Sequence, residues 1–289
     1  MESHESFRAM DTDIDLFIET AGAPPPGAFI GVRLLFEQQE ERFSRFREQS
    51  LLSRLNRGEV IEDAWLARVV AMAIDAHQLT GGYFNPMVLP ALAKAGYDRT
   101  FKEIDAEGPL EPQRVPDPAK VIRVSGLSVE LLAGQMDLGG IVKGWTADLG
   151  AEHLATDHRN AFVNAGGDIR CLGDDATGTG WAMDVSAPDG STGWNGRLTG
   201  AIATSTTLKR RWTVRGGGEA HHLIDPGTGM PSDSPFVQVS VKAEACWLAE
   251  VWAKAVLIGG PSVMERAARA GLAVLAYGRD GARPVSEGW

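Results

Sequence analysis

The chain has 289 residues, enough for one large domain or two modest ones, and its hydrophobic (44%) and charged (23%) contents are ordinary for a soluble globular protein. The formal net charge of −10 argues against a nucleic-acid or anionic-membrane partner, since either would require a basic surface. Two cysteines, Cys171 and Cys246, provide neither a disulfide framework nor zinc-ligand spacing. The sequence has no recognisable secretory signal and no apolar run of the ~18–20 residues that a membrane span needs, so we expect a cytoplasmic protein.

Strand and helix signals follow one another through the N-terminal third. Residues 7–19 alternate apolar and polar side chains, which predicts a strand. Residues 29–46 carry apolar side chains at helical spacing and predict an amphipathic helix. Residues 64–79 predict a second helix, which Thr80-Gly81-Gly82 ends, and a short helix over 88–95 comes next.

The remainder of the chain is rich in strand signals. Residues 102–120 contain five acids and four prolines, and we interpret them as a solvated excursion within one domain. Helices are expected over 145–156, 243–258 and 262–270. Strands are expected over 121–124, 127–132, 161–170 (broken by a Gly-Gly turn), 181–187, 199–204, 210–215, 236–242 and 272–277. This order predicts an α+β fold with mixed, mostly antiparallel sheets and packed helices.

The stretch Met136–Trp145 (MDLGGIVKGW) has the features of an anion site. Gly139 and Gly140 bare the backbone N–H groups just ahead of a predicted helix, and such groups form a concavity that suits phosphate. Lys143 adds a compact cation of the kind that phosphate sites use. A glycine-containing loop with a surface lysine has the same sequence, so both interpretations stay open on these residues alone.

Two polar clusters come at predicted strand ends. Asn164 to Asp168 (NAGGD) suits a ligand loop, and a tight hairpin turn is the alternative. Ala203 to Thr207 (ATSTT) places four hydroxyls side by side, which makes Thr204 a candidate phosphate contact, and a plain Thr/Ser strand is the alternative.

The segment His221 to Gly229 (HHLIDPGTG) holds two histidines, a carboxylate and a threonine. An Asp-Pro turn explains half of this segment, but it does not explain the two adjacent histidines. Histidine suits general acid-base work near neutral pH.

Glu250 and Lys254 are four residues apart on the helix predicted over 243–258. They make an ordinary i,i+4 ion pair in the favoured order. Because their neighbours are largely apolar, part of this helix face is expected to be buried, and a buried carboxylate needs a partner. That partner is Lys254, a metal ion, or each in turn.

Together these motifs resemble the ApbE-type flavin transferases over roughly residues 8–280. The ordered run is FSRFREQSLLSRLN, TGGYFNPMVLPAL, AGYD, MDLGGIVKGWTAD, AFVNAGGDIRCLG, AIATSTTLKRRW, HHLIDPGTGMP and AEVWAKAVLIGG. The resemblance implies one ApbE-like, T-fold-related domain over residues 1–289, with room for two intimately packed lobes. It also implies an enzyme that transfers FMN from FAD to a threonine or serine hydroxyl of a target protein, releasing AMP, with a divalent cation, usually magnesium. An FAD pyrophosphatase and an inactive FAD-binding protein are the alternatives.

The resemblance also implies roles for individual residues. FAD contacts are expected from Met10, Phe46, Tyr83, Phe84, Asn85, Asp137, Lys143 and Ile224. His222 and Lys143 are the expected catalytic residues. Gly140, through its carbonyl, and Glu250 fall at metal positions, and Lys254 falls at a third one.

The chain departs from the family pattern at several of these positions. Asn85 replaces an aspartate, and Thr206 replaces a glycine. Glu250 replaces an aspartate and Lys254 a threonine, so both changes affect the metal site. Because a protonated lysine cannot ligate a cation, Lys254 is expected to place its ammonium where relatives hold magnesium.

Overall fold

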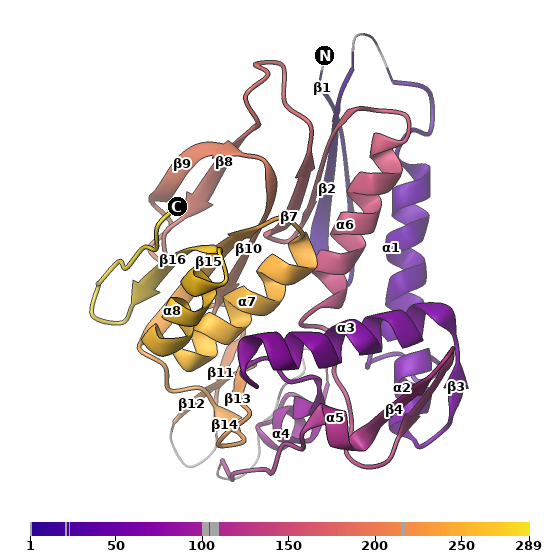
Figure 1. Ribbon diagram of the computed structural model, residues 1–289, viewed down its shortest axis with the longest axis vertical. Coiled ribbons are helices and arrows are strands. Elements are labelled where there is room, and N and C mark those ends of the chain that lie inside the picture. Colours follow the sequence, from indigo (N-terminus) through magenta and orange to yellow (C-terminus); the bar gives the residue numbers. More distant parts are fainter. Residues whose placement is uncertain (1, 21, 23, 100–103, 105–109, 215–217) are drawn as a thin grey trace.

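The computed structural model describes residues 2–20, 22, 24–99, 104, 110–214 and 218–289 (Figure 1). Within these residues a seven-stranded sheet forms the centre of the fold, and every neighbouring pair in it is antiparallel. Its order is β1 (Glu2–Ala9), β2 (Thr12–Glu19), β6 (Asn160–Ala165), β7 (Asp168–Leu172), β10 (Gly200–Thr206), β15 (Phe236–Ala243) and β16 (Ala273–Gly278). The predicted α+β class with mostly antiparallel sheets is confirmed.

The first two strands are a hairpin, so the prediction of a single strand over 7–19 is wrong. Ala9 pairs with Thr12, and the two residues between them, Met10 and Asp11, have φ angles of 51° and 57°. A two-residue hairpin turn needs such positive angles, which glycine and asparagine usually supply. Methionine gives no such signal, and the alternating pattern continues through the turn.

Four helices cover one face of the sheet (Figure 1). They are α1 (Ile30–Phe43), α6 (Val142–Ala155), α7 (Cys246–Gly259) and α8 (Pro261–Arg269). Ile14, Leu16 and Ile18 of β2 alternate toward this face and pack in one core with Ala147 and Ala151 of α6. Helix α6 starts three residues earlier than predicted, which puts Lys143 inside its first turn.

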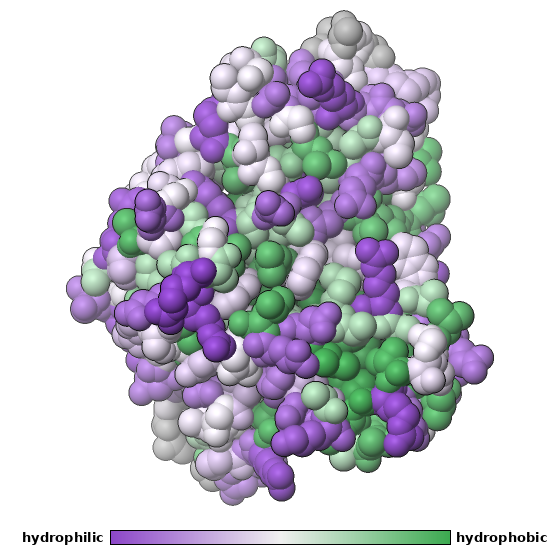
Figure 2. Space-filling model, viewed as in Figure 1, coloured by the Kyte–Doolittle hydropathy of each residue, from purple (hydrophilic) through white to green (hydrophobic). Residues whose placement is uncertain are grey.

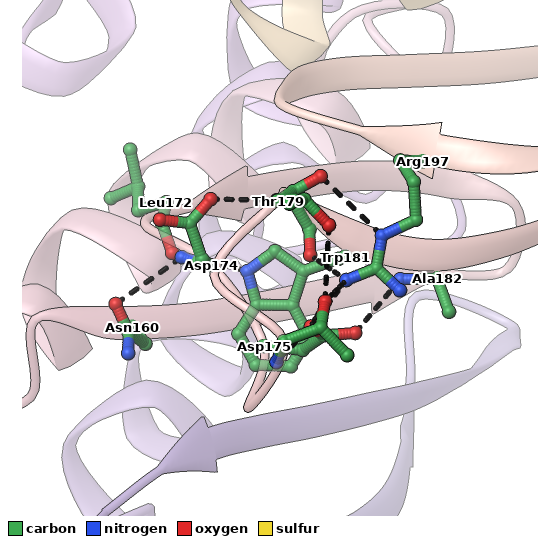
Figure 3. Close-up of polar contacts among 10 residues, drawn as sticks. Asn160, Leu172, Asp174, Asp175, Thr179, Trp181, Ala182 and Arg197 are labelled. Atoms are coloured by element: carbon green, nitrogen blue, oxygen red, sulfur yellow. Dashed lines mark hydrogen bonds and ion pairs between the residues drawn. The ribbon is translucent and has the colours of Figure 1, made fainter.

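The opposite face is covered by a hairpin of β8 (Trp181–Ser186) and β9 (Thr192–Leu198), and β9 was not predicted because its sequence is polar and glycine-rich. Figure 3 shows the loop that ties this hairpin to β7. The indole N–H of Trp181 donates to the Leu172 carbonyl at 3.2 Å, and Arg197 forms an ion pair with Asp175. Phe162 and Ile202 of the sheet pack against the hairpin.

The residues between α1 and α6, together with two short hairpins, form a second layer. It contains α2 (Leu51–Asn56), β3 (Ile61–Glu62), α3 (Ala64–Thr80), η1 (Pro86–Val88), α4 (Leu89–Lys94), α5 (Pro118–Val121), β4 (Ile122–Ser125), β5 (Ser128–Leu131), β11 (Arg211–Thr213), β12 (Glu219–His221), β13 (Ile224–Asp225) and β14 (Met230–Pro231). Asp63 caps α3 by accepting a hydrogen bond from the Leu66 N–H at 2.8 Å. Figure 2 shows a hydrophobic area over this layer. Two of the layer's apolar side chains, Val60 and Leu127, are exposed.

The two layers share one hydrophobic core, because Val251 of α7 packs among the buried residues of α3. The single-domain organisation over residues 1–289 stays a prediction. The predicted excursion over 102–120 lies partly outside the described residues. No helix in the described ranges is long and apolar enough to cross a membrane.

Candidate functional site

A cavity of about 350 Å³ lies at the junction of the two layers. Its size is within the range of ligand pockets. It brings together most of the residues named from the sequence: Met10, Phe46, Tyr83, Phe84, Asn85, Asp137, Gly140, Lys143, His222, Ile224 and Lys254. These residues come from segments far apart in the chain.

Part of the cavity wall is an aromatic platform built on Arg45. Its guanidinium lies 4.2 Å from the ring centroid of Phe46 and 4.5 Å from that of Tyr97. Arg45 Nε also pairs with Asp137 Oδ2 at 2.8 Å, which fixes the guanidinium in place. Phe46 is 44% exposed, so a ring face remains open to a planar ligand.

The Met136–Trp145 stretch is held rigidly beside this platform. Asn56 exchanges two hydrogen bonds with the Met136 backbone, at 2.7 and 2.8 Å. Asp137 Oδ1 accepts the Gly139 N–H at 2.7 Å, so the expectation that this N–H is open to a phosphate is wrong. A Cβ added at Gly140 would lie 3.1 Å from the Phe84 ring and 3.3 Å from Lys254 Cδ, so a glycine fits at this position.

Four charged side chains beside the cavity form one cluster, hereafter the ion cluster: Lys143, Asp168, Glu250 and Lys254. Lys143 Nζ contacts Asp168 Oδ2 and lies 3.4 Å from Glu250 Oε1. Lys254 Nζ lies 2.9 Å from the same Glu250 oxygen. Glu250 is fully buried and Asp168 nearly so, whereas both lysines line the cavity. Both lysine side chains therefore border the ligand space, whereas the carboxylates that hold their ammonium groups do not line it.

The environment keeps Lys143 and Glu250 charged, whereas burial raises the pKa of Asp168. Burial alone would lower the pKa of Lys143, but the Asp168 and Glu250 carboxylates outweigh it and raise that pKa above its ordinary value. Burial alone would raise the pKa of Glu250, but the ammonium groups of Lys143 and Lys254 outweigh it and lower that pKa. Lys143 therefore stays cationic and Glu250 anionic at neutral pH.

Helices α6 and α7 hold the ion cluster through two reciprocal contacts. The Gly144 N–H in the first turn of α6 donates to Glu250 Oε2 at 2.8 Å. In return, Asp148 of α6 accepts the backbone N–H groups of Cys246 and Trp247 at the start of α7, at 2.8 and 3.0 Å. The two helices thus fix each other's first turn, and with it the relative positions of Lys143 and Lys254.

His222 lines the cavity with one nitrogen uncommitted. Its Nδ1 is out of contact with solvent and has no hydrogen-bond partner among the described residues. Burial, reinforced by the charges of Arg210 and Lys254, lowers the pKa of His222 well below its ordinary value. The imidazole is therefore neutral at neutral pH and has a ring nitrogen available to a ligand atom.

Three named residues lie elsewhere than expected or are already engaged. The Thr204 hydroxyl bonds Ser240 Oγ at 2.8 Å and does not line the cavity. Side chains alternate along β10, and Ile202 packs under the β8–β9 hairpin, so Thr204 faces that hairpin while Ser205 faces the helices. Asn85 lines the cavity but caps η1 through the Met87 N–H at 2.9 Å. Glu250 lies behind the cavity wall.

Several residues of the site were missed from the sequence, among them Tyr97, Arg210, Arg45 and Gln39. Arg45 lies within the FSRF segment, but nothing there predicts its pairing with Asp137. Gln39 is fully buried, lines the cavity, and neither polar atom of its side chain has a partner among the described residues. The helical periodicity of α1 could have revealed Gln39, because this residue falls on the same buried face as Phe36 and Phe43.

Within the described ranges there is no group of three or more His, Cys, Asp or Glu side chains that could hold a metal ion. The predicted metal residues Gly140, Glu250 and Lys254 bring one backbone carbonyl, one carboxylate and one ammonium group, and the ammonium of Lys254 lies on the carboxylate.

Comparisons with known proteins identify relatives of this chain. A protein named FAD:protein FMN transferase from Vibrio cholerae is 27% identical over 239 residues, which cover 78% of this chain and 71% of that protein. One of the same name from Treponema pallidum is 31% identical over 255 residues, covering 78% and 69%.

Solved structures show the same fold. The crystal structure of an ApbE protein from Thermotoga maritima superposes with a TM-score of 0.88 at 24% identity, over 99% of this chain and 97% of that one. The flavin transferase ApbE from Vibrio cholerae gives a TM-score of 0.83 at 24% identity, with the same coverage. The ApbE family itself matches residues 10–276 of this sequence. The chain therefore belongs to the ApbE family.

Proposed function

We propose that this protein transfers FMN from FAD to a threonine or serine hydroxyl of an acceptor protein. The observation that carries the proposal is a cavity whose wall combines an aromatic platform at Arg45 and Phe46 with two lysine side chains, Lys143 and Lys254. Such a site suits a planar ring joined to a pyrophosphate. Membership of the ApbE family and the names of the relatives support the same activity.

The chemistry is a displacement at phosphorus. The acceptor hydroxyl oxygen bonds to the FMN phosphorus, the bridging P–O bond breaks, AMP leaves with the bridging oxygen, and the hydroxyl proton is lost to a base or to solvent. Positioning and charge supply most of the catalysis in such reactions. Lys143 and Lys254 neutralise the phosphate oxygens, while neutral His222, which lines the cavity, orients the acceptor hydroxyl. The remaining cavity residues, including Met10, Tyr83 and Ile224, hold the FAD rings.

The family resemblance also implies magnesium, and the residues around Glu250 do not fit it. Glu250 Oε1 already meets two ammonium groups, and Oε2 accepts the Gly144 N–H. An ammonium ~4 Å from a divalent cation would repel it by about 8 kcal/mol at an effective dielectric constant of ~20. The magnesium prediction stays untested, and in the proposed transfer the positive charge at the pyrophosphate comes from the two lysine side chains.

One incubation tests the proposed function. The protein is mixed with FAD and candidate acceptor proteins that present an exposed threonine, and intact-protein mass spectrometry and chromatography follow the products. The proposal expects covalent FMN on the acceptor and an equal amount of AMP. Free FMN with AMP would show that water is the acceptor, as in a pyrophosphatase, and unchanged FAD would show a binding protein. The acceptor's identity and a cytoplasmic location stay predictions.

A further inference from the structure

We propose that the Lys254 ammonium takes the place of a divalent cation in this protein, so that FAD binding and FMN transfer proceed without one. This inference rests on the proposed function for the transfer step, but not for the binding step. It starts from the disagreement between the metal site that the family implies and the side chains that this chain places there.

Both carboxylates of the ion cluster already have cationic partners. Glu250 contacts both ammonium groups, and Asp168 contacts that of Lys143. A magnesium ion would prefer several oxygen ligands in octahedral geometry. In this cluster Oε1 of Glu250 lies 2.9 Å from one ammonium and 3.4 Å from the other, so a cation at that oxygen would meet both. Arg210, which also lines the cavity, adds further positive charge.

The Lys254 ammonium is also fixed. Glu250 holds it from one turn earlier on α7, and Asp148 fixes the start of that helix. Its aliphatic chain runs along the backbone of Gly140, where a Cβ would lie 3.3 Å from Cδ and 3.4 Å from Cε. The side chain is 16% exposed, and that exposed part borders the cavity. A preorganised cation needs no reorganisation when a phosphate arrives.

The two lysines together then act on the pyrophosphate. Each ammonium donates hydrogen bonds to phosphate oxygens and offsets their charge, as a point charge does. An ammonium cannot ligate two oxygens in the manner of a metal ion, so the bridging role is divided between Lys143 and Lys254. Binding and turnover should therefore be insensitive to chelators.

The first test measures binding. Metal-free full-length protein is titrated with FAD in EDTA and again in excess Mg²⁺, and Mn²⁺ is added to the FAD-loaded protein while its free signal is followed by electron paramagnetic resonance. We expect FAD affinities within about threefold of each other and no protein-bound Mn²⁺. A tenfold gain in affinity with Mg²⁺, or one Mn²⁺ bound per chain beyond that taken by FAD alone, would overturn the inference.

The second test isolates the charge at residue 254. Lys254→Cys is alkylated either with 2-bromoethylamine, which restores an ammonium at nearly the original length, or with iodoacetamide, which leaves a neutral group of similar size. Both native cysteines are buried, so the native protein reacts at the new thiol. We expect the aminoethylated form to bind FAD at least tenfold more tightly than the neutral form. Equal affinities would show that the ammonium does not contribute. Lys120→Cys, at an exposed lysine outside the cavity, is the matched control and should not distinguish the two reagents.

A transfer assay separates this inference from the proposed function. FMN transfer that persists in EDTA supports both. Transfer that appears with added Mg²⁺ and vanishes with EDTA would leave the function standing and sink the inference. If FAD stays intact under all conditions while the binding tests give the expected results, the proposed function fails and the assignment of Lys254 stands.

Discussion

Gly144 lies against the backbone of Cys246 at the point where α6 crosses α7. A Cβ added at Gly144 would lie 2.7 Å from the Cys246 carbonyl oxygen, which is closer than the backbone allows. This approach brings the Gly144 N–H within 2.8 Å of Glu250 and so sets the geometry of the ion cluster.

Gly144→Ala should therefore affect both stability and the site. The helices must separate to admit the methyl group, at a cost of about 1–3 kcal/mol in the free energy of unfolding, measured by urea denaturation. FAD affinity should fall with it. Gly150→Ala in the same helix is the control, because its Cβ would meet the side chain of Val32 rather than backbone, and it should cost less. An equal effect of the two substitutions would contradict the role of the crossing.

A second prediction concerns pH and Asp148. Burial raises the pKa of Asp148 to about 6, from an ordinary value of 3.8. Between pH 4 and pH 6 the folded state holds a proton that the unfolded state has released. The stabilisation that this group gives to the folded state is therefore full below about pH 4 and is lost as the pH rises through about 6. The loss amounts to about 3 kcal/mol.

Asp148→Asn should remove that slope, at the cost of one of the two accepted backbone hydrogen bonds, because the amide NH2 cannot accept an N–H. Urea denaturation of both proteins at pH 4, 5, 6 and 7 gives the comparison. We expect the free energy of unfolding of the variant to increase relative to that of the wild type as the pH rises from 4 to 7. A constant difference would show that Asp148 has an ordinary pKa.

Gln39 offers a test of the cavity that does not involve charge. Its two polar side-chain atoms are buried without partners in the described part of the chain, which costs about 1–3 kcal/mol. Gln39→Met should thus raise the free energy of unfolding, measured in denaturant, and weaken FAD binding about tenfold if FAD supplies the missing partners. Unchanged FAD affinity would remove Gln39 from the site.

Lys143 tests the phosphate end of the cavity. A surface lysine would be removed without loss of stability, but this one pairs with the nearly buried Asp168. Lys143→Met should destabilise the fold by about 3 kcal/mol, because it leaves that carboxylate unpaired. Adding Asp168→Asn should restore stability but not FAD affinity, which we expect to stay at least tenfold lower than in the wild type. Recovery of both would mean that Lys143 has a structural role alone.

The sequence predicted the helices and the sheet class well, because periodicity reports which face is buried. Helix α3 was expected over 64–79 and runs from Ala64 to Thr80. The β1–β2 turn was missed because its positive φ angles fall on Met10 and Asp11, where local chemistry gives no turn signal.

Much of the cavity lining was likewise predicted, because the motifs of the family lie close together in space. The sequence did not show which face of the sheet a side chain points to, or which distant residues form ion pairs with one another. Thr204 and Ser205 are neighbours on β10 and point to opposite faces of the sheet. A run of hydroxyl residues in the sequence does not show which of them faces the helices. The charge balance at Glu250 depends on Lys143, over a hundred positions away, and no local pattern contains that contact.

FAD titration is the measurement that tests the central claim most directly, since every role assigned to the cavity requires FAD to bind there. Flavin fluorescence is followed as wild-type protein is added to FAD or to FMN, and as the Lys143→Met/Asp168→Asn double variant is added to FAD. We predict binding of FAD well below ~100 μM, weaker binding of FMN, and at least a tenfold loss of FAD affinity in the double variant. Absence of FAD binding to the wild type at ~100 μM would contradict the account.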